Sequence, residues 1–230
     1  MADAFRYLTG LALALVGFVA AATAAAPAGV PQQVRFTVFS ARPITDVAFV
    51  ARPGLAPQKV AFYPTARSPR YEYRGTTPLR FVDPTSGVVV AEALIPLEVR
   101  DALLLFSPLT PETAKSAGTL RYHVAVLDDS AVRHQSGRLA VVNLSGLELS
   151  GIVGKEAVKL QTGLNPTVSI GRSTAITLRT SVKGRAFPAY SGTVQLAPRE
   201  RALLLLFPPY TKGSVEVQAR LLVDTPPGGG

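Results

Sequence analysis

The sequence predicts an all-β protein of two tandem β-sandwich domains that follow an N-terminal signal peptide. From Val34 onward, short runs rich in Val, Leu, Ile and Phe are interrupted about every 8–12 residues by Gly, Pro, Ser, Asp or Asn, which is typical of a sandwich of short strands. Nearly the same Leu-rich stretch also occurs twice, as VRDALLLFSP from Val99 and as RERALLLLFPP from Arg199. The first observation indicates the class of fold, and the second indicates two related units.

The start of the chain, residues 1–24, has the pattern of a secretory signal peptide. A short segment with one acid and one base is followed by the apolar or small run LALALVGFVAAATAAA. The ATA at 22–24 fits the small-residue cleavage site of such signals, so we expect cleavage near its end. The alternative is an uncleaved anchor, because a spanning helix needs about 20 apolar residues and 5–26 nearly supplies them. Residues 25–33 are then a short leader rich in Pro and Gly.

Alternating patterns predict half-buried strands. In VRFTVFS every second residue from Val34 is apolar, and TLRYHVAVLDD alternates in the same way from Leu120. SVEVQARLLVD places Val215 and Val217 on one inner face. The Leu-rich stretches differ, because their apolar residues are consecutive and each run ends at Pro. Their Glu, Arg, Ala and Leu would favour a helix, yet so short an apolar run suits a central strand buried on both faces, which is what we expect for both copies.

The repeated order of landmarks predicts a tandem duplication. Each Leu-rich stretch follows an Arg-led strand and a Gly-Val or Thr-Val strand, and each precedes a polar turn and an alternating strand that ends in Asp. Corresponding landmarks lie about 100 residues apart, a period that suits duplicated domains better than solenoid repeats. We therefore expect one domain at 34–130, a polar linker at 131–136, a second domain at 137–226 and a disordered tail at 227–230.

Composition limits the setting and the partners. The chain has no Cys, so an exported protein of this kind would rely on its cores without disulfides, a habit more typical of bacterial than of animal secretion. The net charge is +9, and it stays +9 when the acid and the base of the signal segment are removed. This excess of Arg suits acidic glycans, lipid head groups or nucleic acid, and the plain alternative is that it serves solubility alone.

Few residues are arranged for catalysis or metal binding. His123 lies on the polar face of a predicted strand and His134 lies in the linker, without the spacing of a zinc site. Asp128 and Asp129 end a predicted strand, where we expect them to bond nearby backbone in a turn. The motifs G-x-S-x-G and S-x-x-K and a Gly-rich phosphate loop do not occur in the sequence. We therefore predict that the protein is not an enzyme and that it has no metal site and no cofactor.

One basic, aromatic stretch is the strongest candidate for a ligand site. Residues 59–81 hold five bases and one acid, interleaved with Phe and Tyr, and the second repeat has no counterpart. Arg offers paired donors to carboxylate, sulfate or phosphate, and Tyr offers a flat face to sugars or bases. Alternation places Tyr71 and Tyr73 on the face opposite the charged residues, so an ordinary edge hairpin is the competing interpretation. The predicted ligand-binding residues are Arg67, Arg70, Tyr71, Tyr73, Arg74 and Arg80.

A set of turn and strand-entry residues in the second repeat carries a family resemblance. These residues are Asn143, Ser145, Gly154, Val194, Leu196 and Pro198. They form an Asn-Ser turn after an opening strand, a Gly-led hairpin and a V-x-L-x-P entry into the apolar strand. This pattern resembles the secreted immunoglobulin-like domains of unknown function in bacterial envelope proteins, although Arg199 or Glu200 stands where that family usually has Gly. The resemblance implies two immunoglobulin-like sandwiches in an exported protein, and it brings no catalytic residues.

These observations lead to an expectation about function. We expect an exported, non-catalytic binding or structural protein of the bacterial cell envelope, in the periplasm or at the cell surface. One alternative is an accessory module that binds anionic polysaccharide, and a second is a small hydrolase with an unrecognised site. The expected partner is an anionic envelope glycan or another envelope protein rather than nucleic acid. No transmembrane helix is expected once the signal is removed.

Overall fold

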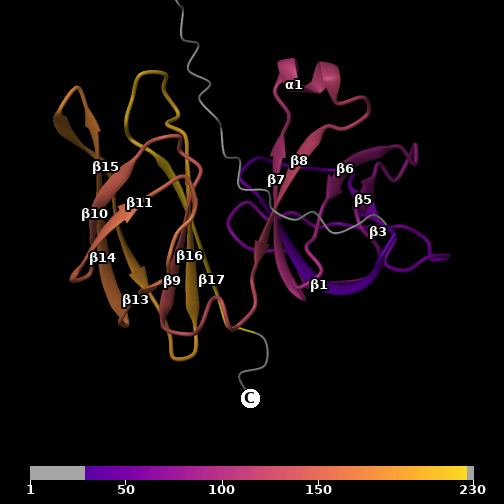
Figure 1. The fold of residues 1–230 in the computed structure, drawn as a ribbon, viewed down its shortest axis with the longest axis horizontal. Coiled ribbons are helices and arrows are strands. Elements are labelled where there is room, and N and C mark those ends of the chain that lie inside the picture. Colours follow the sequence, from indigo (N-terminus) through magenta and orange to yellow (C-terminus); the bar gives the residue numbers. More distant parts are fainter. Residues whose placement is uncertain (1–28, 227–230) are drawn as a thin grey trace, which may run out of the picture.

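The computed structural model describes residues 29–226 as an almost entirely β structure (Figure 1). Strands account for 50% of the chain and helix for 3%, in agreement with the predicted all-β sandwich class. Among the described residues, no helix is both long enough and apolar enough to cross a membrane. The predicted signal peptide at 1–24, the first part of the leader and the predicted tail at 227–230 lie outside the described residues.

Eight strands form two sheets in the N-terminal half of the described chain. One sheet has the order β4-β1-β7-β8 and the other has the order β3-β2-β5-β6. All neighbours are antiparallel except β1 and β7, which run parallel. The strands are β1 (Pro31–Ser40), β2 (Ala48–Phe49), β3 (Gln58–Lys59), β4 (Tyr71–Thr76), β5 (Leu79–Val82), β6 (Val89–Ala93), β7 (Asp101–Pro108) and β8 (Tyr122–Asp128).

The C-terminal half also has two sheets. Their orders are β12-β9-β16-β17, with β13 also paired to β9, and β11-β10-β14-β15. Here β9 and β16 are the parallel pair. The strands are β9 (Arg138–Asn143), β10 (Leu149–Val153), β11 (Glu156–Leu160), β12 (Gly163–Leu164), β13 (Val168–Ser169), β14 (Ser173–Val182), β15 (Arg185–Gln195), β16 (Arg201–Phe207) and β17 (Gln218–Asp224).

The two halves pair their strands in the same order. In each half the first strand lies parallel to the penultimate strand, and the penultimate strand pairs antiparallel with the last. A constant-type immunoglobulin sandwich instead places its penultimate strand between the third and the last. The halves therefore share one strand order, and that order differs at this position from the immunoglobulin pattern.

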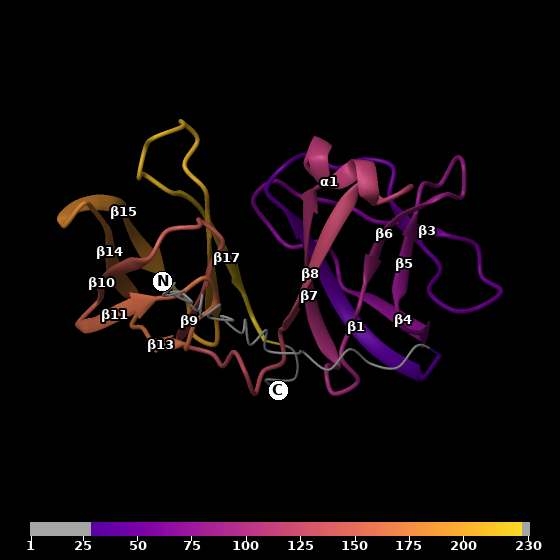
Figure 2. The same ribbon diagram turned by 45° about the horizontal axis from the view of Figure 1, so that its top comes forward.

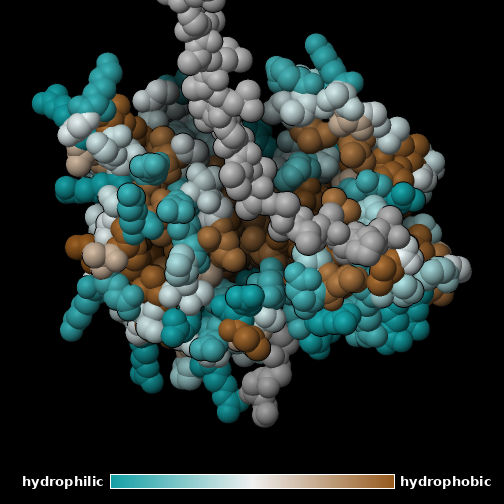
Figure 3. All heavy atoms as spheres, in the orientation of Figure 1, coloured by the Kyte–Doolittle hydropathy of each residue, from teal (hydrophilic) through white to brown (hydrophobic). Residues whose placement is uncertain are grey.

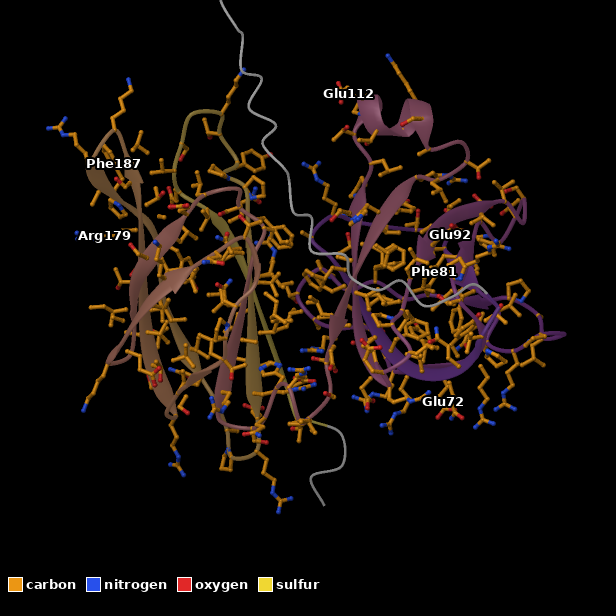
Figure 4. The ribbon with its side chains drawn as sticks, viewed as in Figure 1. Glu72, Phe81, Glu92, Glu112, Arg179 and Phe187 are labelled. Atoms are coloured by element: carbon orange, nitrogen blue, oxygen red, sulfur yellow. The ribbon has the colours of Figure 1, made fainter. Side chains whose placement is uncertain are left out.

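Each half encloses a core between its own two sheets. In the N-terminal half aromatic rings meet edge to face, with 5.1 Å between the centroids of Phe36 and Phe49, and Figure 4 shows Phe81 inside this half. The core of the C-terminal half is mainly aliphatic, with residues such as Ile176 and Leu204.

A third apolar cluster lies between the halves, where the sheet of β1, β7 and β8 packs against the sheet of β9, β16 and β17 (Figures 1 and 2). Figure 3 shows hydrophobic side chains gathered between the halves. The Leu runs serve both environments, because Leu104 and Leu204 point into the cores of their own halves while Leu105 and Leu205 point into the cluster. The buried members are Phe39, Leu103, Leu105, Ala140, Val142, Leu203, Leu205 and Leu222. Burial of each such Leu contributes about 1.5–3 kcal/mol.

This arrangement answers why the Leu runs lack alternation. Both strands are central in their sheets and buried on both faces, as predicted. The alternation of β1 is confirmed as far as Phe36, with Val34 and Phe36 in the core. The prediction of a half-buried strand is wrong from Phe36 to Ser40, a segment that is buried on both faces because Phe39 lies in the cluster between the halves. At the end of the chain the last strand begins only at Gln218, so Val215 and the buried Val217 precede it.

One short helix was not expected. The helix α1 (Pro111–Ser116) follows β7 and has Thr110 as its N-cap, whose hydroxyl accepts a hydrogen bond from the backbone N–H of Thr113. Pro111 and Glu112 occupy its first turn, which are residues that favour a helix start. The signals for this helix were therefore present in the sequence, although it is too short to show an apolar period.

Candidate functional site

The predicted basic, aromatic stretch is split among three environments. Tyr71 and Tyr73 lie on the inner face of β4 and belong to the N-terminal core, whereas Glu72 and Arg74 point outward, so the predicted alternation is confirmed. The Tyr71 hydroxyl accepts a hydrogen bond from the backbone N–H of Ala61 at 2.8 Å. Figure 4 shows Glu72 at the outer rim of this half. The two tyrosines therefore do not form an exposed stacking face beside the outward charges.

Arg70 and Arg80 form ion pairs at the surface. The Nη1 of Arg70 lies 3.9 Å from an oxygen of Asp101, and the Nε of Arg80 donates to Glu92 at 3.0 Å. Arg80 and Glu92 are both well exposed, and pairs of this kind contribute about 0–1 kcal/mol to stability. These two arginines lie apart from each other and are not joined into one site.

Arg67 has an internal position that the sequence does not reveal. The hydroxyl of Ser68 accepts a hydrogen bond from the backbone N–H of Val38 at 2.8 Å, which holds this segment beside β1. As a result, the Arg67 side chain is buried between the halves and pairs with Asp129. Its Nη2 lies 3.6 Å from Asp224.

Arg201, the first residue of β16, is at the centre of this buried ion cluster. It is fully buried and makes five hydrogen bonds, which matches the five N–H donors of a guanidinium. Two go to the carboxylate of Asp224 and one to the carboxylate of Asp129, at 2.9–3.1 Å. The other two go to the backbone carbonyls of Asp129 and His134 at 3.0 Å. Two arginines and two aspartates therefore neutralise each other where the halves meet.

His134 closes one side of the ion cluster. Its Nε2 lies 2.9 Å from the carbonyl oxygen of Ala202, and because a carbonyl only accepts, Nε2 carries the proton and donates. Its Nδ1 lies 3.9 Å from Asp129. Although it lies in the predicted polar linker, the ring is only 4% exposed.

The two strand-end aspartates have different roles. Asp128 accepts a hydrogen bond from the backbone N–H of Ser130 at 3.0 Å, so the predicted local turn is confirmed for it. The same prediction is wrong for Asp129, whose carboxylate binds Arg67 and Arg201. Burial is the largest single influence on the pKa of Asp129 and opposes ionisation. The His134 side chain and the charges of Arg67 and Arg201 together outweigh it and hold this pKa below its usual range.

A separate hollow opens at the end of the N-terminal sandwich where β1 and β4 pair. We call it the end hollow. It has a volume of about 650 Å³, within the range of about 300–1,000 Å³ that small-molecule sites occupy. Its wall is mostly apolar, with two arginines. The lining residues are Pro31, Gln32, Gln33, Val50, Pro53, Tyr73, Arg74, Gly75, Thr76 and Arg100.

Tyr73 and Gly75 shape the end hollow together. A Cβ at Gly75 would lie 2.4 Å from the Tyr73 hydroxyl oxygen, so only glycine lets the ring lie across this part of β4. The hydroxyl donates to the carbonyl oxygen of Thr76 at 2.5 Å. Burial raises the pKa of this hydroxyl against the opposing charge of Arg80, so it stays a neutral donor. The wall is thus fixed by internal contacts.

Several polar groups of the end hollow lack hydrogen-bond or ion-pair partners in the part of the chain that the structure describes. Gln32 is only 6% exposed, and neither atom of its amide has a hydrogen-bond partner among the described residues. Arg100 donates to the backbone carbonyl of Gln33 at a long 3.3 Å. Within 29–226, no carboxylate lies at ion-pair distance from Arg74 or Arg100. Two of the six predicted ligand residues, Tyr73 and Arg74, line this hollow, although they lie on opposite faces of β4.

Sequence reasoning missed the other polar residues of both sites. Gln32 and Gln33 precede the first predicted strand, and Arg100 lies inside the first Leu-rich stretch, whose pattern indicates a strand and no binding residue. Arg201 looks like a surface charge beside Glu200. Its one signal is its place at the start of a run that is buried on both faces.

Comparison of the chain with models of protein families finds no match, and neither does comparison with curated proteins.

Proposed function

We propose that the protein is an exported, non-catalytic binding or structural protein of the bacterial cell envelope. In this proposal the chain consists of a signal peptide and two tandem sandwich domains, comparable in architecture to immunoglobulin-like domains although their strand order differs. The shared strand order of the two halves and the signal-like start of the sequence support it.

The observation that carries the proposal is that the buried charged groups are paired with one another. Asp129 carries a carboxylate that could serve proton transfer, but it is bound with Arg201 into a neutral network at the junction of the halves. Arg201 has all its donors engaged within the protein. Such a network, together with the apolar cluster beside it, holds two sandwiches in one orientation. Two sandwiches in a fixed orientation form a stable scaffold whose surfaces and hollows can bind partners.

A second candidate function is the binding of anionic polysaccharide as an accessory module. The end hollow favours it, because Arg74 and Arg100 are among its lining residues and have no carboxylate partner among the described residues. Guanidinium groups that lack a carboxylate partner are suited to pair with carboxylate or sulfate groups of a ligand.

Export and the absence of catalysis can be tested with the full chain carrying a C-terminal tag in a bacterial host. We expect it in the periplasmic or surface fraction, with a mass reduced by residues 1–24. The matched control lacks 1–24 and should stay in the cytoplasm. Recovery of the uncleaved chain in the cytoplasm would contradict the proposal. Acidic oligosaccharides incubated with the purified protein should be recovered at full length, and shortened products would instead favour a hydrolase.

A further inference from the structure

We infer that the end hollow binds a carboxylated sugar, the hexuronate unit of an acidic polysaccharide. This inference rests on the proposed binding function and assigns it a site and a ligand class. Three features of the hollow carry it: a buried amide without partners, two arginines and an apolar wall.

The amide of Gln32 selects for hydroxyl groups. An amide has both an acceptor oxygen and a donor NH₂, and both lack partners among the described residues. A sugar hydroxyl both donates and accepts, so neighbouring hydroxyls can satisfy both atoms. Sulfate oxygens only accept and would leave the amide oxygen of Gln32 unpaired, and the hydrogen phosphate ion, although it has an O–H donor, has no ring face for the apolar wall. Leaving a buried polar group unpaired is unfavourable, so the amide favours a ligand that carries hydroxyls.

The arginines select for a carboxylate. Arg74 and Arg100 both line the hollow, and no acidic residue is among the residues that line it. A guanidinium matches the planar geometry of a carboxylate and can bind it through two parallel hydrogen bonds. The positive wall therefore favours an acidic sugar over a neutral one of the same shape.

The apolar wall suits the body of a pyranose ring. Val50, Pro53 and the ring of Tyr73 line the hollow beside the polar groups. A pyranose has C–H groups on its faces and hydroxyls at its rim, so one face can pack on this wall while the rim meets Gln32. Internal contacts hold Tyr73 across Gly75, so this part of the wall is fixed. The amide of Gln32 is almost inaccessible and has to turn toward the hollow when a ring binds.

The test is calorimetric titration of the full chain with trigalacturonate at low salt. The neutral galactose trimer, inorganic phosphate and inorganic sulfate are the comparison ligands. We expect trigalacturonate to bind at least about tenfold more tightly than each of these, with affinity falling as salt is raised. Arg100→Ala and Arg74→Ala should each weaken binding by about 10- to 100-fold. Arg179→Ala is the matched control and should bind as the wild type does, because Arg179 lies on the outer side of the other half (Figure 4).

A second variant separates loss of the site from loss of the fold. Gln32→Leu removes a buried amide that lacks partners, so its melting temperature should be equal to or higher than that of the wild type. Its affinity for trigalacturonate should fall about tenfold or more. Weaker binding with unchanged stability supports the site, whereas unchanged binding by Gln32→Leu overturns it.

The outcomes distinguish this inference from the proposed function. Equal binding of the neutral trimer would overturn the inference while leaving a binding protein. Equal binding of phosphate or sulfate would show an anion site without sugar selection and would overturn it too. No binding of any probe at low salt would remove the site, and the export experiment would then decide the proposed function by itself.

Discussion

The central strands β7 and β16 hold the same place in the two halves but begin with opposite charges. Asp101 opens β7 and pairs with Arg35, its register partner on β1, at 2.8 Å. Arg201 opens β16, is fully buried and bonds Asp129 of the other half. Arg138, the first residue of β9, instead donates to Thr167. One strand thus begins in a local pair near the surface, and the other begins in a contact across the junction.

This difference shows how two similar sandwiches acquire a defined mutual orientation. An apolar cluster alone tolerates sliding, because burial depends on area and hardly on direction. The five hydrogen bonds of Arg201 are directional, and they join the end of β8, the linker and the end of β17. We therefore infer that the Leu faces provide most of the affinity between the halves, and that the ion cluster fixes their relative orientation.

The largest expected effect comes from placing a charge on either face of the Leu strands. Leu104→Asp puts an unpaired charge in a closed core and should abolish soluble, cooperatively folded protein. Leu205→Asp puts the same charge between the halves, which can part and hydrate it. That variant should keep strand content by circular dichroism and show a larger radius of gyration by X-ray scattering. A compact Leu205→Asp protein, or a folded Leu104→Asp protein, would break the distinction between the two faces.

The next effect contrasts the two charges that open the central strands. Arg201→Ala leaves the buried Asp129 and the partly buried Asp224 without their main partner and should reduce the free energy of unfolding by about 3–5 kcal/mol. Asp101→Ala removes a pair whose Arg35 is 46% exposed, and it should cost about 1 kcal/mol or less. Urea denaturation of both variants measures the difference. Equal losses of unfolding free energy would show that the buried position of Arg201 does not make its ion pairs more stabilising than those of Asp101.

The smallest effect is a pH dependence specific to Asp129. Since the folded pKa of Asp129 is below its unfolded value of about 3.9, its contribution is present above that value and is lost as pH falls through the folded pKa. Asp129→Asn should therefore be less stable near neutrality and should lose stability less steeply as the pH is lowered from 5 toward 3. Asp128→Asn, one residue away, is the control and should keep the wild-type slope. Denaturation midpoints at several pH values provide the measurement, and parallel slopes for Asp129→Asn and the wild type would contradict the assignment.

The sequence predicts strands well where burial is one-sided or complete. Alternation placed Val34 and Phe36 correctly, and the continuous Leu runs indicated strands covered on both faces. What covers the second face could not be inferred, because a Leu beside a partner sheet looks the same as a Leu in its own core. The helix α1 was missed because one turn leaves no period to detect.

The candidate sites were predicted less well, for a physical reason. The sequence pattern at 59–81 does not distinguish one arginine from another. In the structure Arg67 is buried between the halves, Arg80 is paired at the surface and Arg74 lines the end hollow. Which of these occurs depends on contacts between residues far apart in the chain, such as Val38 with Ser68. Gln32 offers no chemical signal in the sequence, and its importance comes from the missing partners of a buried amide.

The two-faced burial of β7 has a consequence for the order of biosynthesis. The N-terminal half is complete once Asp128 has emerged, but Phe39, Leu103 and Leu105 are fully covered only when β16 and β17 have joined β9. That delay spans roughly 100 residues, or about 5–20 s of translation at ~5–20 residues per second. During this interval the nascent chain exposes an apolar, aggregation-prone sheet face. A holdase chaperone would therefore have to shield this face before the second half docks.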